Sequence, residues 1–153
     1  MKKKENPTPF PPSEADARAL YEKIMERDRN DKRPFLTLAF DFQMKYLWES
    51  GKRKALGHCT GADWNAPRYC MVDVMKRYGL APGLLADIIA HASTYVRLFP
   101  ANGICNPRDI YETELRNLFD YKTIDLANRL KEAIGKKYRI RYKTTTDGKL
   151  VEV

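Results

Sequence analysis

Three cysteines and two histidines are the side chains of this sequence that could hold a metal or act as a nucleophile pair. They are His58, Cys59, Cys70, His91 and Cys105. Zinc ribbons and fingers place pairs of such ligands two to four residues apart, and that spacing is absent here. No nucleophile-elbow or oxyanion pattern accompanies a cysteine either. We therefore predict no metal, no cofactor and no catalytic residue, and we interpret Cys70 and Cys105 as small buried hydrophobic residues.

The composition is that of one globular domain. Hydrophobic residues make up 43% of the 153 residues and charged residues 31%. No apolar run approaches the ~20 residues that span a bilayer, and the first residues lack the apolar stretch of a secretory signal. An odd number of cysteines without C-x-x-C spacing indicates reduced thiols. These features predict a cytoplasmic protein that has no membrane segment.

The positive charge is concentrated at the end of the chain. The net charge is +8, and the segment 136–153 supplies half of it, with six basic residues against two acidic ones. Such clustering is typical of a surface that binds anions such as nucleic acid. Basic residues also protect strand edges from pairing with other chains, and both interpretations stay open at this point.

The same segment has the pattern of a β-hairpin over residues 138–153. Two runs of strand-forming residues flank Asp147 and Gly148, which supply the positive φ angles of a two-residue type I′ turn. That turn predicts a register in which Lys143 lies opposite Glu152, so that opposite charges face each other.

The elements before the hairpin begin with a proline-rich basic arm over residues 1–12. Ser13 and Asp16 then form a capping box, which predicts a helix that ends near Arg29. We expect a single helical domain over residues 13–153.

Residues 35–50 are ambiguous between helix and strand. Alternating apolar residues such as Leu36 and Leu38 are typical of a strand, whereas the length of the run to Trp48 allows a buried helix. Gly51 stands where a helix C-cap would fall, and on that basis we predict a helix.

Four further helices are predicted from caps and apolar periodicity. They cover residues 65–78, with Gly79 as C-cap, then 82–99, 107–119 and 122–134, which ends at Gly135. We expect a break at Asp120 and a buried apolar face on the helix over 107–119. That face consists of Ile110, Tyr111, Leu115, Leu118 and Phe119. The predicted fold class is mainly α with a small C-terminal β-hairpin, an α+β protein with about six helices.

From residue 82 onward this element order resembles that of the winged helix-turn-helix family. In that family a short strand joins the hairpin in a small sheet, and residues 103–105 could supply it here. The resemblance implies that the helix over 122–134 enters a major groove while the hairpin, or wing, contacts phosphates or the minor groove. The implied contacts on the helix are Lys122, Asn128, Arg129 and Lys131. The implied contacts on the wing are Arg139, Arg141, Lys143 and Lys149.

Two functions are compatible with these patterns. The first is non-catalytic nucleic-acid binding, with DNA preferred over RNA, through the basic hairpin and the helix before it. Tyr138 and Tyr142 could then stack on bases, although packing on the last helix explains them equally. The alternative is a small interaction factor that docks on a larger protein complex through helix faces, with Trp48 or Trp64 as anchors.

Overall fold

A computed structural model describes residues 13–50, 58–59, 71–99 and 110–153. The chain divides into two compact units, Met1–Lys32 and Arg33–Val153. Unit 1 contains helix α1 (Glu14–Asn30), whose N-terminus has the predicted cap: the Asp16 amide donates to Ser13 Oγ at 3.2 Å, and Ser13 Oγ donates to an Asp16 carboxylate oxygen at 2.6 Å. Unit 2 contains the sheet and the other helices.

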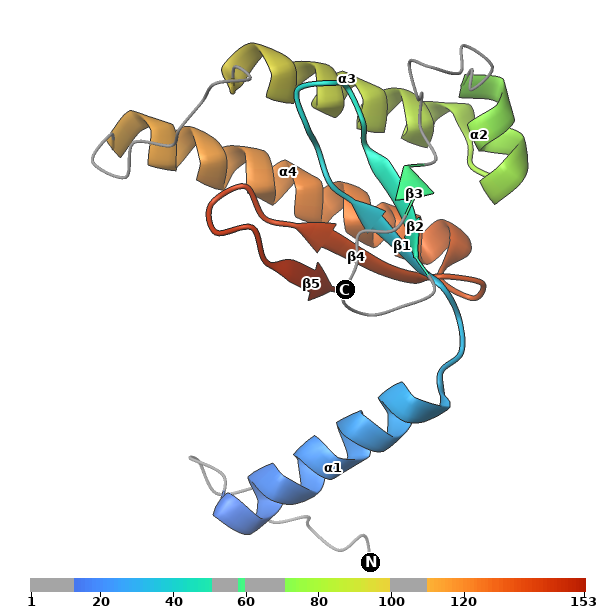
Figure 1. Ribbon diagram of the computed structural model, residues 1–153, viewed down its shortest axis with the longest axis vertical. Coiled ribbons are helices and arrows are strands. Elements are labelled where there is room, and N and C mark those ends of the chain that lie inside the picture. The colour runs from blue at the N-terminus through green and yellow to red at the C-terminus, as the bar shows by residue number, and fades with distance from the viewer. Residues whose placement is uncertain (1–12, 51–57, 60–70, 100–109) are drawn as a thin grey trace, which may run out of the picture. The chain divides into compact units, whose positions relative to one another are not determined.

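Five strands form one mixed sheet in the described part of unit 2, in the order β3-β2-β1-β4-β5 (Figure 1). They are β1 (Phe35–Leu38), β2 (Leu47–Ser50), β3 (His58–Cys59), β4 (Arg139–Lys143) and β5 (Leu150–Glu152). Strands β1 and β4 are parallel, and the other neighbouring pairs are antiparallel. The sheet therefore joins the beginning of unit 2 to its end.

The predicted helix over residues 35–50 is wrong, because this segment forms β1 and β2. All four residues of β1 are buried, since the strand has a neighbour on each edge and is covered on both faces. A strand buried on both faces loses the apolar-polar alternation that separates strands from helices in a sequence. The predicted cap, Gly51, lies outside the described residues.

The C-terminal hairpin is confirmed, but its predicted register is wrong. Lys143 lies opposite Leu150, and Glu152 lies opposite Arg141. The connecting loop is longer than two residues: the Thr144 amide donates to the Lys149 carbonyl at 2.9 Å, and Gly148 has φ +69°. Within this longer loop, the side chains of Thr145 and Thr146 donate hydrogen bonds to Asp120. The third strand beside the hairpin is β1, whereas residues 103–105 lie outside the described residues.

Three helices belong to unit 2: α2 (Met71–Tyr78), α3 (Pro82–Leu98) and α4 (Ile110–Ile134). Gly79 follows α2 with φ +66°, as predicted for a C-cap, and α4 ends just before Gly135. The predicted starts at residues 65 and 107 lie outside the described residues.

The predicted fold class is wrong, because the described residues contain four helices and a five-stranded sheet rather than about six helices and a lone hairpin. The expected break at Asp120 is absent, and α4 runs unbroken for 25 residues. A single helix thus replaces the two that the winged-helix comparison required, and β1 replaces the expected wing strand.

Helices α3 and α4 pack side by side on one face of the sheet (Figure 1). Their fully buried side chains meet those of the two central strands in one core. The largest of these are Leu36, Leu38, Leu85, Ile88, Leu126, Leu130 and Ile140. Because strand residues alternate between faces, Phe35, Thr37, Arg139 and Arg141 lie on the opposite face of the sheet.

Asp120 ties the hairpin loop to α4. Its side chain is 8% exposed, and one carboxylate oxygen accepts from the Thr145 amide at 2.9 Å and from the Thr145 hydroxyl at 2.8 Å. The other oxygen accepts from the Thr146 hydroxyl at 3.3 Å. One helical turn earlier, Arg116 donates to the Thr145 carbonyl at 3.2 Å. The residue expected to break the helix is therefore the residue that anchors the hairpin to it.

Replacing this anchor should destabilise the protein. We expect Asp120→Ala to lower the free energy of unfolding by about 2 kcal/mol, because the Thr145 amide and the Thr145 and Thr146 hydroxyls lose their charged acceptor. Asp125→Ala, at a largely exposed position of the same helix, should change it by less than about 0.5 kcal/mol. Urea denaturation measures both, and equal small effects would show that the anchor contributes little.

Candidate binding groove

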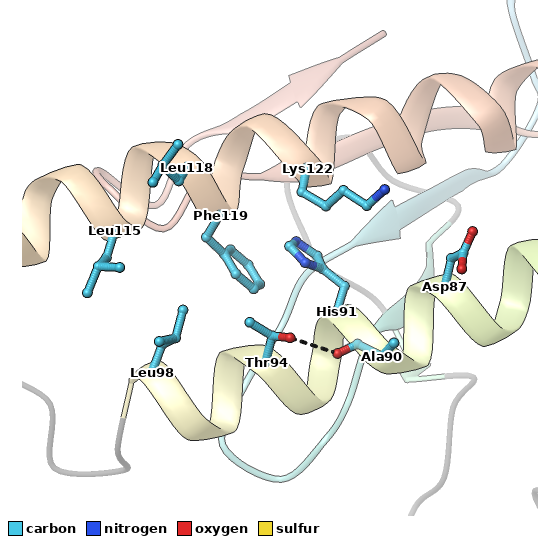
Figure 2. A pocket seen from close by; sticks show the side chains of 9 residues that line it. All are labelled: Asp87, Ala90, His91, Thr94, Leu98, Leu115, Leu118, Phe119 and Lys122. Carbon is cyan, nitrogen blue, oxygen red and sulfur yellow. Dashed lines mark hydrogen bonds between the residues drawn. The ribbon is translucent and has the colours of Figure 1, made fainter.

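A groove of about 440 Å³ runs between α3 and α4 (Figure 2). Helix α3 contributes Asp87, Ala90, His91, Thr94 and Leu98. Helix α4 contributes Leu115, Leu118, Phe119 and Lys122. The three- and four-residue steps in both sets place each set on one side of its helix. The groove is thus made by one stripe from each of two packed helices.

The groove is largely apolar, and apolar side chains at one of its ends are exposed to solvent. Leu98 and Leu115 come from opposite helices and point toward each other there, and they are 38% and 39% exposed (Figure 2). Leu118 is 68% exposed beside them. Thr94 adds little polarity, because its hydroxyl donates to the Ala90 carbonyl within α3 at 3.0 Å. Clustered exposed apolar side chains of this kind are typical of interaction sites.

His91 and Phe119 form the floor of the groove. Their rings point toward each other from the two helices and stack with centroids 3.7 Å apart and an interplanar angle of 11° (Figure 2). Phe40 packs edge-on against both rings, at 4.9 and 5.4 Å. Tyr95 and Phe99 complete the cluster around Phe119. Contacts on several sides hold the Phe119 ring, so the floor is a fixed aromatic surface.

His91 donates a hydrogen bond from Nε2 and has a lowered pKa. Its Nε2 lies 2.9 Å from Thr123 Oγ1, and that hydroxyl donates to the Phe119 carbonyl at 3.1 Å. Since the hydroxyl proton is used, Oγ1 accepts from an Nε2–H of His91. Burial lowers the pKa of His91 from 6.5 to about 4, and the charge of Lys122 acts in the same direction. The floor of the groove is therefore uncharged at neutral pH.

The charged residues at the other end of the groove pair with neighbours. Asp87 accepts from Arg129 at 2.7 Å, which links α3 to α4, and Lys122 lies 3.4 Å from Asp125. These pairs are substantially exposed, so they contribute little to stability. Of these charged residues, Asp87 and Lys122 line the groove, so one negative and one positive side chain lie beside the apolar floor.

The eight residues predicted to contact nucleic acid do not share one environment. Lys122 lines the groove, Arg129 pairs with Asp87, and Asn128 and Lys131 are exposed on α4. Lys149 is exposed and lies 3.5 Å from Asp147. Lys143 is half-buried beside a second, smaller pocket of about 240 Å³ that Arg116 also lines.

Arg139 and Arg141 are buried in the sheet, at 7% and 3% exposure. Arg139 donates to both carboxylate oxygens of Glu152, at 2.8 and 2.7 Å. Arg141 donates from Nε to Thr37 Oγ1 at 2.6 Å, and both guanidinium groups lie within 4.6 Å of the Phe35 ring centroid. Burial lowers the pKa of Arg141, and Arg139 acts in the same direction. The hydrogen bonds of these two arginines are therefore made within the protein. Glu152 pairs with Arg139 rather than with Lys143, which the predicted register placed opposite it.

Tyr138, Tyr142 and Trp48 make contacts within the protein. Tyr142 is 8% exposed in the core, and Tyr138 packs on Tyr78 with ring centroids 5.5 Å apart. Packing therefore explains this pair better than base stacking does. Trp48 is half-buried and donates from its indole to the Ala39 carbonyl at 3.0 Å. Trp64 lies outside the described residues.

No group of three or more histidine, cysteine or acidic side chains within the described residues is placed to hold a metal ion. Cys70 and Cys105 lie outside those residues. Among the helices that the structure describes, none combines the length and apolar content needed to cross a membrane.

The sequence did not identify the groove. Five residues of α4 were expected to share one buried face, yet Tyr111 is 79% exposed, Leu118 is 68% exposed and Leu115 is 39% exposed, whereas Phe119 is buried. The available signal was that the first half of α4 is apolar on more than one side, which a single core face does not require.

Comparison of the chain with protein-family models, with curated proteins and with solved structures finds no match. The groove must therefore be interpreted from its own geometry.

The buried neutral histidine predicts a specific pH dependence. Above pH 6.5 His91 is neutral in both the folded and unfolded states. Between pH 6.5 and the folded-state pKa of about 4, His91 binds a proton in the unfolded state but not in the folded state. Stability should therefore fall by about 3 kcal/mol across this interval through this residue.

The measurement is urea denaturation of the wild type and His91→Phe from pH 7.5 to pH 4. The variant keeps an aromatic ring on Phe119 but cannot titrate, so it should lose less stability than the wild type as the pH falls. Parallel curves for the two proteins would contradict the assignment of a buried neutral His91.

The buried arginines predict that charge removal in the hairpin acts through stability. We expect Arg139→Ala to lower the free energy of unfolding by about 1 to 3 kcal/mol, because it removes a bidentate ion pair and the packing on Phe35. Lys149→Ala, at an exposed position on the same hairpin, should change it by less than about 0.5 kcal/mol. Thermal or urea unfolding distinguishes them, and an equally small effect of Arg139→Ala would show that its internal contacts are weak.

Proposed function

We propose that this protein is a non-catalytic binding protein whose α3–α4 groove takes an amphipathic helix of a protein partner. The observation that carries the proposal is the set of apolar side chains left exposed between two packed helices, above an aromatic floor. A groove between two helices suits a third helix, which inserts apolar residues at three- and four-residue steps.

The polar groups of the groove support binding rather than catalysis. His91, the titratable residue on the floor, donates to Thr123 and has its pKa lowered to about 4. Within the part of the chain that the structure describes, its hydrogen-bond partner is the Thr123 hydroxyl, which donates its own proton to the Phe119 carbonyl, so no acidic side chain orients His91 as a general base. Asp87 and Lys122, one charge of each sign at the same end, would orient the partner helix rather than select it by net charge.

Nucleic-acid binding is the second candidate, favoured by the net charge of +8 and the exposed Lys131 and Lys149. It ranks below the first because Arg139 and Arg141, two of the four predicted wing contacts, are engaged within the sheet. Binding of labelled DNA and RNA across a salt series, with Lys149→Glu as the variant, would support this candidate if affinity falls steeply with salt and with the substitution.

The groove is tested with helical peptides. A displayed library of amphipathic helical peptides is selected on the intact protein, and a selected peptide is titrated against the wild type, Leu115→Glu and Leu118→Glu. Each substitution places a charge among the apolar contacts, so affinity should fall at least about tenfold, equivalent to 1.4 kcal/mol or more. Asn117→Glu adds the same charge on an exposed position of α4 outside the groove and should leave the affinity unchanged.

Circular dichroism and urea unfolding check that each variant is folded. A selected peptide that binds the Leu115 and Leu118 variants as tightly as it binds the wild type would overturn the groove as the binding site. A selection that yields no helical peptide would overturn the proposed class of partner.

A further inference from the structure

Helix α1 carries an exposed apolar stripe over its middle two turns. Ala17, Leu20, Tyr21 and Ile24 follow three- and four-residue spacing, which places them on one side of the helix. Leu20 is 60% exposed, Tyr21 62% and Ile24 49%, and α1 has no buried residue. This differs from α3 and α4, whose apolar residues supply the core of unit 2.

A helix with this exposure requires an additional source of stability. Isolated helices shorter than about 12 to 15 residues are marginal in water, and α1, at 17 residues, is only slightly longer. Its cap at Ser13 and the Arg18–Glu14 pair, 3.7 Å apart, contribute modest amounts. Burial of the stripe against another surface would supply the missing contribution.

The charges of α1 indicate what that surface is. Its first turn is acidic, with Glu14 and Asp16, and its last turn is basic, with Arg27 and Arg29. At 100° per residue, Asp16 and Arg27 flank one edge of the stripe, and Glu14 and Arg29 lie beyond the other edge. Two copies of α1 that run antiparallel therefore place Asp16 of each beside Arg27 of the other, and the acidic end that holds Glu14 beside the basic end that holds Arg29. A parallel pair would instead bring like charges and like helix ends together.

We propose that α1 pairs antiparallel with α1 of a second copy of the chain, so that the protein forms a homodimer through this stripe. The interface consists of one short helix from each copy and is smaller than the ~1,200–2,000 Å² of a standard stable interface. The dimer is therefore expected to be weak and to exchange with the monomer as concentration changes. This proposal is independent of the α3–α4 groove.

Sedimentation equilibrium of the full-length protein over a concentration series tests the dimer. The wild type should show a concentration-dependent shift from monomer to dimer. Leu20→Glu places a charge in the stripe and should weaken dimerisation at least about tenfold. Ala19→Glu introduces the same residue one position away, on the opposite side of the helix, and should leave dimerisation unchanged. Leu118→Glu, in the groove, should also have no effect.

Charge exchange tests the orientation. The variants Arg27→Glu/Arg29→Glu and Glu14→Arg/Asp16→Arg should each lose self-association, because like charges then meet at both ends of the antiparallel pair. Mixed in equal amounts, they should form a heterodimer in which all the facing charges are opposite. Circular dichroism checks that α1 is still helical in each variant.

A wild-type protein that is monomeric at every concentration would overturn the dimer, and so would a dimer that Leu20→Glu does not weaken. Unchanged self-association of either charge variant alone would overturn the antiparallel orientation.

Discussion

The parallel pairing of β1 with β4 is the contact on which unit 2 depends. It joins Phe35 to Arg139 and Leu38 to Tyr142, across 104 residues of sequence. Strand β2 pairs with β1, β5 pairs with β4 and β3 extends the sheet from β2, while α3 and α4 pack on one face of the sheet. A parallel pair needs a long connection between its strands, and here α2, α3 and α4 all lie in that connection. The groove lies between α3 and α4 where the two helices pack against each other over the sheet.

The pairing of β1 with β4 also explains why part of the C-terminal positive charge is buried. On the sheet face away from the helices, Arg139 and Arg141 lie over Phe35, and their donors are used by Glu152 and Thr37. Planar guanidinium groups can stack on an aromatic ring and donate in fixed directions, which an ammonium group cannot do equally well. The arginines of the hairpin thus act as structural residues of the sheet, while the lysines provide the exposed charge. Net charge alone could not distinguish these two uses of a basic residue.

What the sequence predicted correctly was local, and what it missed depends on distant partners. The Ser13 cap, Gly79, the end of α4 and the existence of the hairpin follow from side chains that act within a few residues. Strand β1 could not be recognised in this way, because its neighbour β4 lies at the other end of the chain. The hairpin register was missed for a similar reason. Asp120, which is distant in sequence, accepts hydrogen bonds from Thr145 and Thr146, so these residues belong to the loop and not to the paired strands. The groove was missed because the burial of Leu36 or Phe119 and the exposure of Leu118 are decided by packing between elements.

Polar contacts explain why the apolar side chains of the groove do not turn inward. Within one turn of α4, Phe119 stacks on His91, Asp120 binds the hairpin loop and Thr123 accepts from His91. About one and two turns after Thr123, Leu126 and Leu130 are fully buried in the core. Together these contacts fix the rotation of α4 about its axis, so Leu115 and Leu118 cannot reach the core without breaking buried hydrogen bonds. Breaking such bonds costs about 1 to 3 kcal/mol each, comparable to what burying one leucine would gain. The exposed stripe is therefore a property that the fold maintains, which is what a preformed binding surface requires.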